Sequence, residues 1–167
     1  MTAATVERWA SYPQSALPHT YLHPGQLHVT SNRCSLTTIL GSCVAVCLHD
    51  PEHGVGGMNH FLLPNASQDP ATASRYGPSA MKLLLERAIA LGARPHTLTA
   101  RIIGGANVLA AFHDLHDHLG IRNVELARAY LGERGVRVVG EDIGGTHGRK
   151  LVFGPHDGRA WVQLIRR

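Results

Sequence analysis

Aromatic side chains are scarce in this sequence of 167 residues, at 5%, and only 17% of its residues are charged. Hydrophobic residues nevertheless make up 44%, a balance that excludes a disordered chain, a collagen and a coiled coil. The longest apolar run, residues 39–48, is interrupted by Gly41 and Ser42 and is much shorter than the roughly 20 residues of a membrane-spanning helix. We therefore expect a globular protein that does not insert into a membrane.

Cysteine is also scarce, and the three that occur do not form pairs. Cys34, Cys43 and Cys47 are an odd set whose spacing fits neither a disulfide framework nor the paired cysteines of a zinc ribbon. Residues 1–9 include an acidic side chain and lack the apolar stretch of a secretory signal. Free thiols in a reducing compartment are expected, and with them a cytoplasmic location.

Lysine is nearly absent, since Lys82 and Lys150 are the only two among 16 basic residues. The formal net charge is +4, and the arginines are spread along the chain with no basic block and no interleaved aromatic residues. This distribution lacks the usual footprint of a nucleic-acid-binding protein. A diffuse positive surface favours an acidic protein partner instead.

The pattern of apolar residues divides the chain into an arm, residues 1–23, and a domain, residues 24–167. Proline and polar residues without periodicity fill the arm. One helix is expected between Ser79 and Gly92 and a second over residues 122–134, from apolar residues at helical spacing. Short apolar runs predict strands at 27–29, 34–39, 43–48, 55–63, 97–103, 136–139, 151–153 and 160–165. The expected fold class is α/β (α+β): a single-domain layered sandwich with a mixed, mostly antiparallel sheet and two main helices.

A tight turn in the middle of the strand-rich region predicts a β-hairpin. Asp50-Pro-Glu-His-Gly54 suits a type I turn followed by a glycine bulge. If Asp50 pairs with His53, then Cys43 lies directly opposite His60, with Cβ atoms about 4.5–5.5 Å apart. A slip of one residue would send the two side chains to opposite faces of the sheet.

A cysteine beside a histidine is suited to acyl transfer. The imidazole raises the thiolate fraction by forming an ion pair and supplies the proton that a leaving amine needs. Gly41 and Ser42 allow a tight backbone approach, so amides around Ser42 and Cys43 are candidate donors to an oxyanion. A hydroxyl from Thr37 or Thr38 is a candidate for holding the imidazole tautomer.

Simpler interpretations of the same residues exist. A lone cysteine is a common small core residue, and we expect that role for Cys47, while Cys34 is expected to be inert. Ser42 is a weaker nucleophile candidate because its surroundings lack the second glycine of a nucleophile elbow.

A histidine cluster further along the chain offers a possible metal site. His113, His116 and His118 have acidic neighbours, and their spacing fits a solvated loop or helix end better than a set of metal ligands. We expect no metal and no cofactor.

Two sequence words resemble the CheD family, the chemoreceptor glutamine deamidases of bacterial and archaeal chemotaxis. They are G-S-C-V-A-V-C-x-x-D-P at residues 41–51 and G-x-M-x-H-x-x-L-P at residues 56–64. The resemblance extends from about residue 25 to the end of the chain through further words at residues 103–106, 121–123, 141–145 and 148–149.

This resemblance implies a catalytic triad of Cys43, His60 and Thr37. It also implies hydrolysis of glutamine side chains on the cytoplasmic helices of chemoreceptors through a thioester, an α/β sandwich fold, and a CheC-type phosphatase as a partner. Two other functions remain open: a regulatory module that binds such a phosphatase in the same cleft, and a methylesterase acting on receptor glutamyl esters.

Overall fold

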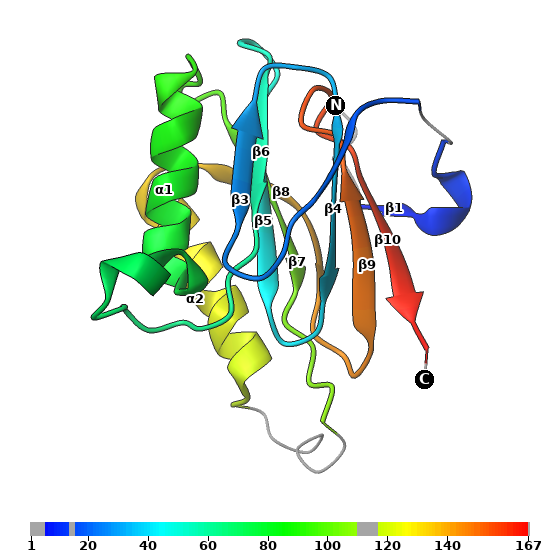
Figure 1. The fold of residues 1–167 in the computed structure, drawn as a ribbon, viewed down its shortest axis with the longest axis vertical. Helices are drawn as coiled ribbons and strands as arrows, with labels where there is room; N and C mark the ends of the chain where they lie inside the picture. Colours follow the sequence, from blue (N-terminus) through cyan, green and yellow to red (C-terminus); the bar gives the residue numbers. More distant parts are fainter. Residues whose placement is uncertain (1–5, 14–15, 110–116, 167) are drawn as a thin grey trace.

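The protein is built from three layers, two β-sheets and one layer of helices (Figure 1). The computed structural model describes residues 6–13, 16–109 and 117–166. The outer sheet has the strand order β1-β10-β9-β4-β2, and the central sheet has the order β3-β6-β5-β7-β8. The strands are β1 (Glu7–Arg8), β2 (His19–Tyr21), β3 (Leu27–Thr30), β4 (Ser35–Leu40), β5 (Val44–Asp50), β6 (Val55–Asn59), β7 (Thr99–Gly104), β8 (Arg137–Ile143), β9 (Gly148–Phe153) and β10 (Ala160–Ile165).

Most neighbouring strands run antiparallel, including the hairpin β5–β6 and the pair β4–β9. The pairs β1–β10, β2–β4 and β7–β8 are parallel. The predicted layered α/β sandwich with a mixed, mostly antiparallel arrangement is therefore confirmed, although its strands form two sheets.

Two α-helices cover the face of the central sheet that points away from the outer sheet. Helix α1 (Gly77–Ala90) has a proline in its first turn, where a missing N–H leaves no hydrogen bond unmade. Helix α2 (Leu119–Glu133) is capped by His118, whose ring accepts a hydrogen bond from the Ile121 N–H. Both helices bury one apolar stripe against the sheet, as their spacing predicts. The described residues also include two short 3₁₀ segments, η1 (Trp9–Ser11) and η2 (Pro70–Arg75).

Each pair of layers encloses its own hydrophobic core. The core between helices and central sheet contains Val44 and Phe61, and the core between the two sheets contains Ala45, Cys47 and Met58. Alternate residues of β5 therefore enter different cores, which explains why the strand is buried along its whole length. None of the helices in the described ranges is long and apolar enough to cross a membrane.

The segment predicted as an N-terminal arm contributes two short strands to the outer sheet. Glu7 and Arg8 pair with β10, and residues 19–21 pair with β4. These strands were missed because two or three residues with no alternation carry too little sequence signal. The division of the chain between residues 23 and 24 stays a prediction.

Candidate active site

The predicted hairpin exists, but its register differs from the expected one by two residues. Asp50 pairs with Val55 instead of His53, and the ladder continues to a bridge between Val44 and Phe61. The direct pairing of Cys43 with His60 is therefore wrong: the two are diagonal neighbours in the ladder. Diagonal side chains are typically about 7–8 Å apart at the Cα level and still share one face.

The register follows from the turn at residues 51–54, which places four residues between the paired strand ends. The Gly54 N–H donates to the Asp50 carbonyl at 2.9 Å, and Gly54 has a φ of +64°, a conformation that glycine adopts without strain. The Asp50 carboxylate accepts from the N–H groups of Glu52 and His53 at 3.0 and 3.2 Å. These bonds close a longer turn than the one predicted, because they use Asp50 as an internal cap.

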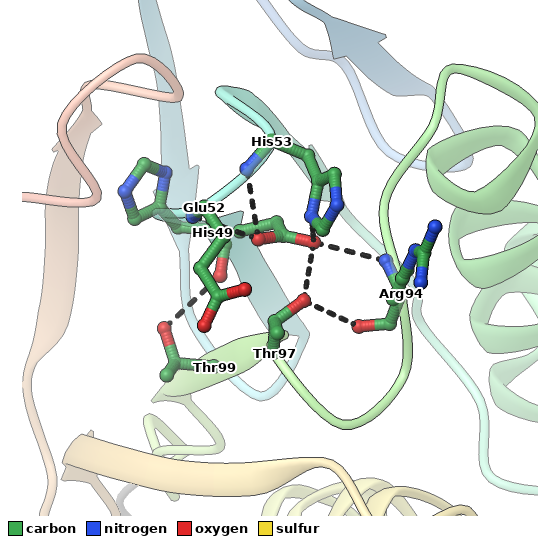
Figure 2. Close-up of polar contacts among 7 residues, drawn as sticks. His49, Glu52, His53, Arg94, Thr97 and Thr99 are labelled. Carbon is green, nitrogen blue, oxygen red and sulfur yellow. Dashed lines mark hydrogen bonds and ion pairs between the residues drawn. The ribbon is translucent and has the colours of Figure 1, made fainter.

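The same carboxylate joins this turn to the loop before β7, and Figure 2 labels its partners His53, Arg94 and Thr97. It accepts from the Thr97 hydroxyl at 2.6 Å, from the Arg94 N–H at 2.9 Å and from the His53 ring at 2.9 Å. Burial by itself would raise the pKa of Asp50, but the hydrogen bonds from Thr97, Arg94 and His53 outweigh it and hold the pKa well below its ordinary value. Asp50 is therefore an ionised structural anchor for the hairpin.

Asp50→Asn is expected to lower the free energy of unfolding by about 3 kcal/mol at pH 7, because an amide NH₂ would face donors that now bind a carboxylate. Urea denaturation measures the loss. The control is Asp69→Asn, since Asp69 is an exposed cap of η2 and asparagine caps equally well; its expected change is under about 0.5 kcal/mol. Equal losses in both variants would contradict the anchor role.

The pH dependence of the Asp50 effect has a definite sign. A carboxyl whose pKa is lower in the folded state stabilises the fold above its ordinary pKa of about 4 and loses this contribution as the pH falls further. The difference between wild type and Asp50→Asn should therefore shrink below about pH 4. A difference that grows in acid would refute this assignment.

The two residues predicted as nucleophile and base share the face of the central sheet that points toward the outer sheet. Val44 and Phe61 face the helices, so their chain neighbours Cys43 and His60 face the other way. Cys43 lies partly exposed against the core between the sheets, and His60 is only 2% exposed. The Val44–Phe61 bridge is closed by two hydrogen bonds of 3.1 and 3.0 Å, which fixes the relation between the two segments.

The hydrogen bonds of His60 define its tautomer. The Thr38 hydroxyl donates its single proton to the Leu22 carbonyl at 2.7 Å and lies 2.7 Å from Nδ1 of His60. The hydroxyl can therefore only accept from the ring, which means that Nδ1 carries the proton and Nε2 the lone pair. Nε2 is buried and has no hydrogen-bond partner among the described residues. His60 thus presents a free basic nitrogen.

Thr37, the third residue implied by the family resemblance, does not contact His60. Side chains alternate along β4, so Thr38 enters the space between the sheets and Thr37 lies on the other face. The Thr37 hydroxyl is 3.4 Å from Nδ1 of His19 and lines a cavity of about 520 Å³ with His19 and Tyr21. As a partner of the imidazole, Thr37 is corrected to Thr38.

The ion pair expected between Cys43 and His60 is not favoured in this structure. Burial raises the pKa of the Cys43 thiol, and a hydrogen bond with its own backbone only partly offsets this. Burial lowers the pKa of His60 to about 4, although a hydrogen bond with the Leu22 backbone partly opposes this shift, and nearby His23 lowers the pKa a little further. Both groups are therefore neutral near pH 7.

The loop after β7 is hydrogen-bonded to the turn that carries Gly41 and Ser42. The Ala106 N–H donates to the Gly41 carbonyl and the Gly105 N–H to the Cys43 carbonyl, both at 2.9 Å. Gly104, with a φ of +111°, lies so close to the Cys43 carbonyl that any Cβ would clash with it. The double glycine is therefore required for close backbone packing beside Cys43.

One residue at this turn was missed by sequence reasoning. The side chain of Asn123, fully buried on α2, donates to the carbonyls of Ser42 and Leu62 at 3.1 and 2.8 Å. Its only sequence signal was its place in the word at residues 121–123, which says nothing about contacts.

The other cysteines and the histidine cluster take structural positions where the structure describes them. All three thiols are free, and Cys47 is fully buried with its pKa raised to about 12 by burial, which confirms its predicted core role. His118 is the N-cap of α2, while His113 and His116 lie outside the described residues. Within the described ranges no group of three or more His, Cys, Asp or Glu side chains could hold a metal ion.

Comparison with known proteins identifies clear relatives. A family model described as CheD chemotactic sensory transduction matches residues 62–164. The chain is 48% identical over 145 residues to "Probable chemoreceptor glutamine deamidase CheD 1" of Anaeromyxobacter dehalogenans, covering 87% of this chain and 84% of that protein. It is 47% identical over 133 residues to "Probable chemoreceptor glutamine deamidase CheD" of Trichlorobacter lovleyi, covering 80% of this chain and 82% of that protein.

A longer relative and a solved structure extend the comparison. The Burkholderia orbicola protein with the same name is 43% identical over 153 residues, covering 89% of this chain, which spans only 61% of that protein. Among solved structures, the Neisseria meningitidis protein NMB0706 is similar with a TM-score of 0.46 and 14% identity, covering 77% of this chain and 64% of that one.

Proposed function

This chain belongs to the CheD family, and we propose that it hydrolyses glutamine side chains of chemoreceptors to glutamate, with Cys43 as the nucleophile and His60 as the base. The names of the relatives supply the substrate class. The observation that carries the proposal is the unprotonated Nε2 of His60, which lies on the same sheet face as Cys43 and has no hydrogen-bond partner among the residues that the structure describes. A cytoplasmic location is part of the proposal.

The first half of the reaction forms a thioester. Nε2 of His60 takes the Cys43 proton as Sγ attacks the carbonyl carbon of the glutamine carboxamide. The carbonyl oxygen becomes an oxyanion, for which the N–H groups of Ser42 and Cys43, beside Gly41, are the proposed donors. When the carbon–nitrogen bond breaks, the imidazolium returns its proton to the leaving nitrogen, and ammonia departs.

The second half restores the enzyme. His60 takes a proton from a water molecule, whose oxygen attacks the thioester carbon. The carbon–sulfur bond then breaks, the thiolate recovers the proton from the imidazolium, and glutamate is the product. No metal or cofactor is needed, because every proton moves between the thiol, the imidazole, water and the amide.

A neutral resting pair suits this sequence of steps. Because the pKa of Cys43 is raised and that of His60 is lowered, both groups start neutral, and in the proposed mechanism the proton moves from Sγ to Nε2 as the sulfur bonds to the substrate carbonyl. The hydrogen bond from Nδ1 to Thr38 keeps Nε2 available throughout.

The test of the function is ammonia release from a receptor cytoplasmic fragment. Purified protein is incubated with the helical region of a chemoreceptor, and the modified glutamines are located by mass spectrometry as amide-to-acid changes.

Methanol release from methylated receptor distinguishes the methylesterase alternative. Adding a CheC-type phosphatase tests the proposed partnership, because a partner that occupies the same cleft must change the deamidation rate.

The choice between the two threonines is testable by a matched pair of variants. Thr38→Val is expected to reduce kcat by about 10²-fold, because Nδ1 of His60 loses the acceptor that defines its tautomer. Thr37→Val removes a hydroxyl whose hydrogen-bond partner among the described residues is the ring of His19, and it should keep kcat within about threefold of wild type. Full activity in Thr38→Val together with an inactive Thr37→Val would reverse the assignment.

A further inference from the structure

Asn123 connects three elements of the candidate active site through one amide group. The residue lies near the start of α2 and is completely buried. Its Nδ2 group donates to the Ser42 carbonyl at 3.1 Å and to the Leu62 carbonyl at 2.8 Å. Ser42 directly precedes Cys43, and Leu62 follows His60 by two residues. A single side chain thus holds the backbone beside both predicted catalytic residues.

The contact with Ser42 determines the direction of the Cys43 amide. A peptide group is planar, and in the trans form its C=O and N–H point in opposite directions. The described residues contain no cis peptide bond. Because Asn123 holds the Ser42 oxygen toward α2, the Cys43 N–H points away from the helix layer, toward the sheet face on which the side chains of Cys43 and His60 lie. A hydrogen bond to the carbonyl also polarises the N–H of the same peptide and makes it a better donor.

The contact with Leu62 secures the second segment. Phe61 is already joined to Val44 by the paired bridge, and the Asn123 amide adds a hydrogen bond one residue beyond it. The relative position of the Cys43 and His60 segments is thereby set by contacts on both sides of the bridge.

The oxygen of the same amide group is less well satisfied than its nitrogen. Oδ1 of Asn123 is buried and has no hydrogen-bond partner in the described part of the chain. A buried acceptor without a partner lowers stability, and an apolar side chain of similar size would avoid that loss but would take the donor away from both carbonyls. The function of the amide therefore lies in its two donors.

We propose that Asn123 is a positioning residue that aims the Cys43 N–H at the oxyanion of the tetrahedral intermediate by holding the Ser42 and Leu62 carbonyls. This inference rests on the proposed amide hydrolysis. It predicts an effect on the chemical step and little effect on substrate binding, since the oxyanion exists only during the reaction.

The experiment compares Asn123→Ala and Asn123→Asp with wild type. Aspartate fills the same space but, when ionised, donates no hydrogen bond, so it keeps the test informative if the alanine variant does not fold. Each folded variant is expected to lose about 10²-fold in kcat with KM within about threefold, the effect of losing one oriented oxyanion donor. In a proton–nitrogen correlation spectrum of each variant, the amide protons of Cys43 and Leu63 should move upfield, because the carbonyls of their peptide groups lose a hydrogen bond.

Asn59 provides the matched control. It is also a fully buried asparagine that faces the helices, but it accepts from the Val46 N–H and contacts the Met81 sulfur. Asn59→Ala should lower stability while leaving kcat within about twofold and the Cys43 amide resonance in place. A folded Asn123 variant with kcat near wild type, or with an unmoved Cys43 resonance, would overturn the proposal. If wild type releases no ammonia, the proposed function fails, and the two resonances still report whether Asn123 orients the peptide.

Discussion

Cys43→Ala is expected to reduce ammonia release from the receptor fragment by at least about 10⁴-fold, the largest effect of any single substitution in this protein. Without Sγ there is no atom to form the thioester, and what remains is binding and oxyanion stabilisation acting on water. The measurement is single-turnover ammonia release with enzyme in excess, which separates loss of chemistry from slow product release.

The control for this prediction is Cys47→Ala, which removes a thiol from β5, four residues further along the chain and on the same sheet face. Cys47 is fully buried in the core between the sheets, so its loss should lower stability by roughly 1 kcal/mol and leave the rate nearly unchanged. A Cys43→Ala variant that keeps more than about a hundredth of the wild-type rate would exclude a covalent thioester mechanism at this residue.

His60→Ala is expected to reduce the rate by about 10²–10⁴-fold, the range that a general acid and base supplies. The loss arises twice, because the same imidazole deprotonates the thiol and protonates the leaving nitrogen. His49→Gln is the matched control: His49 is also nearly buried, at the other end of β5, and donates to the Pro155 carbonyl, so it should leave the rate within about threefold. Comparable losses in both variants would mean that the rate falls whenever a buried histidine is replaced, and would contradict a specific role of His60 as the base.

The pH profile of the wild-type enzyme tests the same residue without a substitution. Because burial lowers the pKa of His60 to about 4, the imidazole stays a competent base well below the ordinary histidine pKa of about 6.5. The acid limb of kcat/KM should therefore lie near pH 4 to 5. A limb near 6.5 would mean that His60 is solvated in the working enzyme, or that another group provides the base.

Much of the architecture was readable from local sequence signals. The helices were predicted because the apolar residues between Ser79 and Gly92 recur at helical spacing and because glycine and proline end the pattern. The hairpin was predicted because its turn residues lie between two β-branched runs. These features depend on neighbours in the chain, so sequence alone carries them.

Local sequence signals did not predict that the strands divide into two sheets. Residues of β5 alternate between two cores, so the strand is apolar throughout and its periodicity does not show which face meets which layer. The short β1 and β2 strands depend entirely on the longer strands beside them.

By itself, the sequence determined which residues could carry the chemistry: a cysteine directly before one strand of a hairpin and a histidine directly after the other, on the same face, since a shift of two residues keeps the parity of a strand. The tertiary structure decided the rest. The bonds of Asp50 to a distant loop anchor the turn of the hairpin, the position of Leu22 beside β4 placed Thr38 against His60, and the docking of α2 brought Asn123 to the Ser42 carbonyl. The physical reason is that hydrogen bonds between segments far apart in the chain depend on distances in space, which no local pattern encodes.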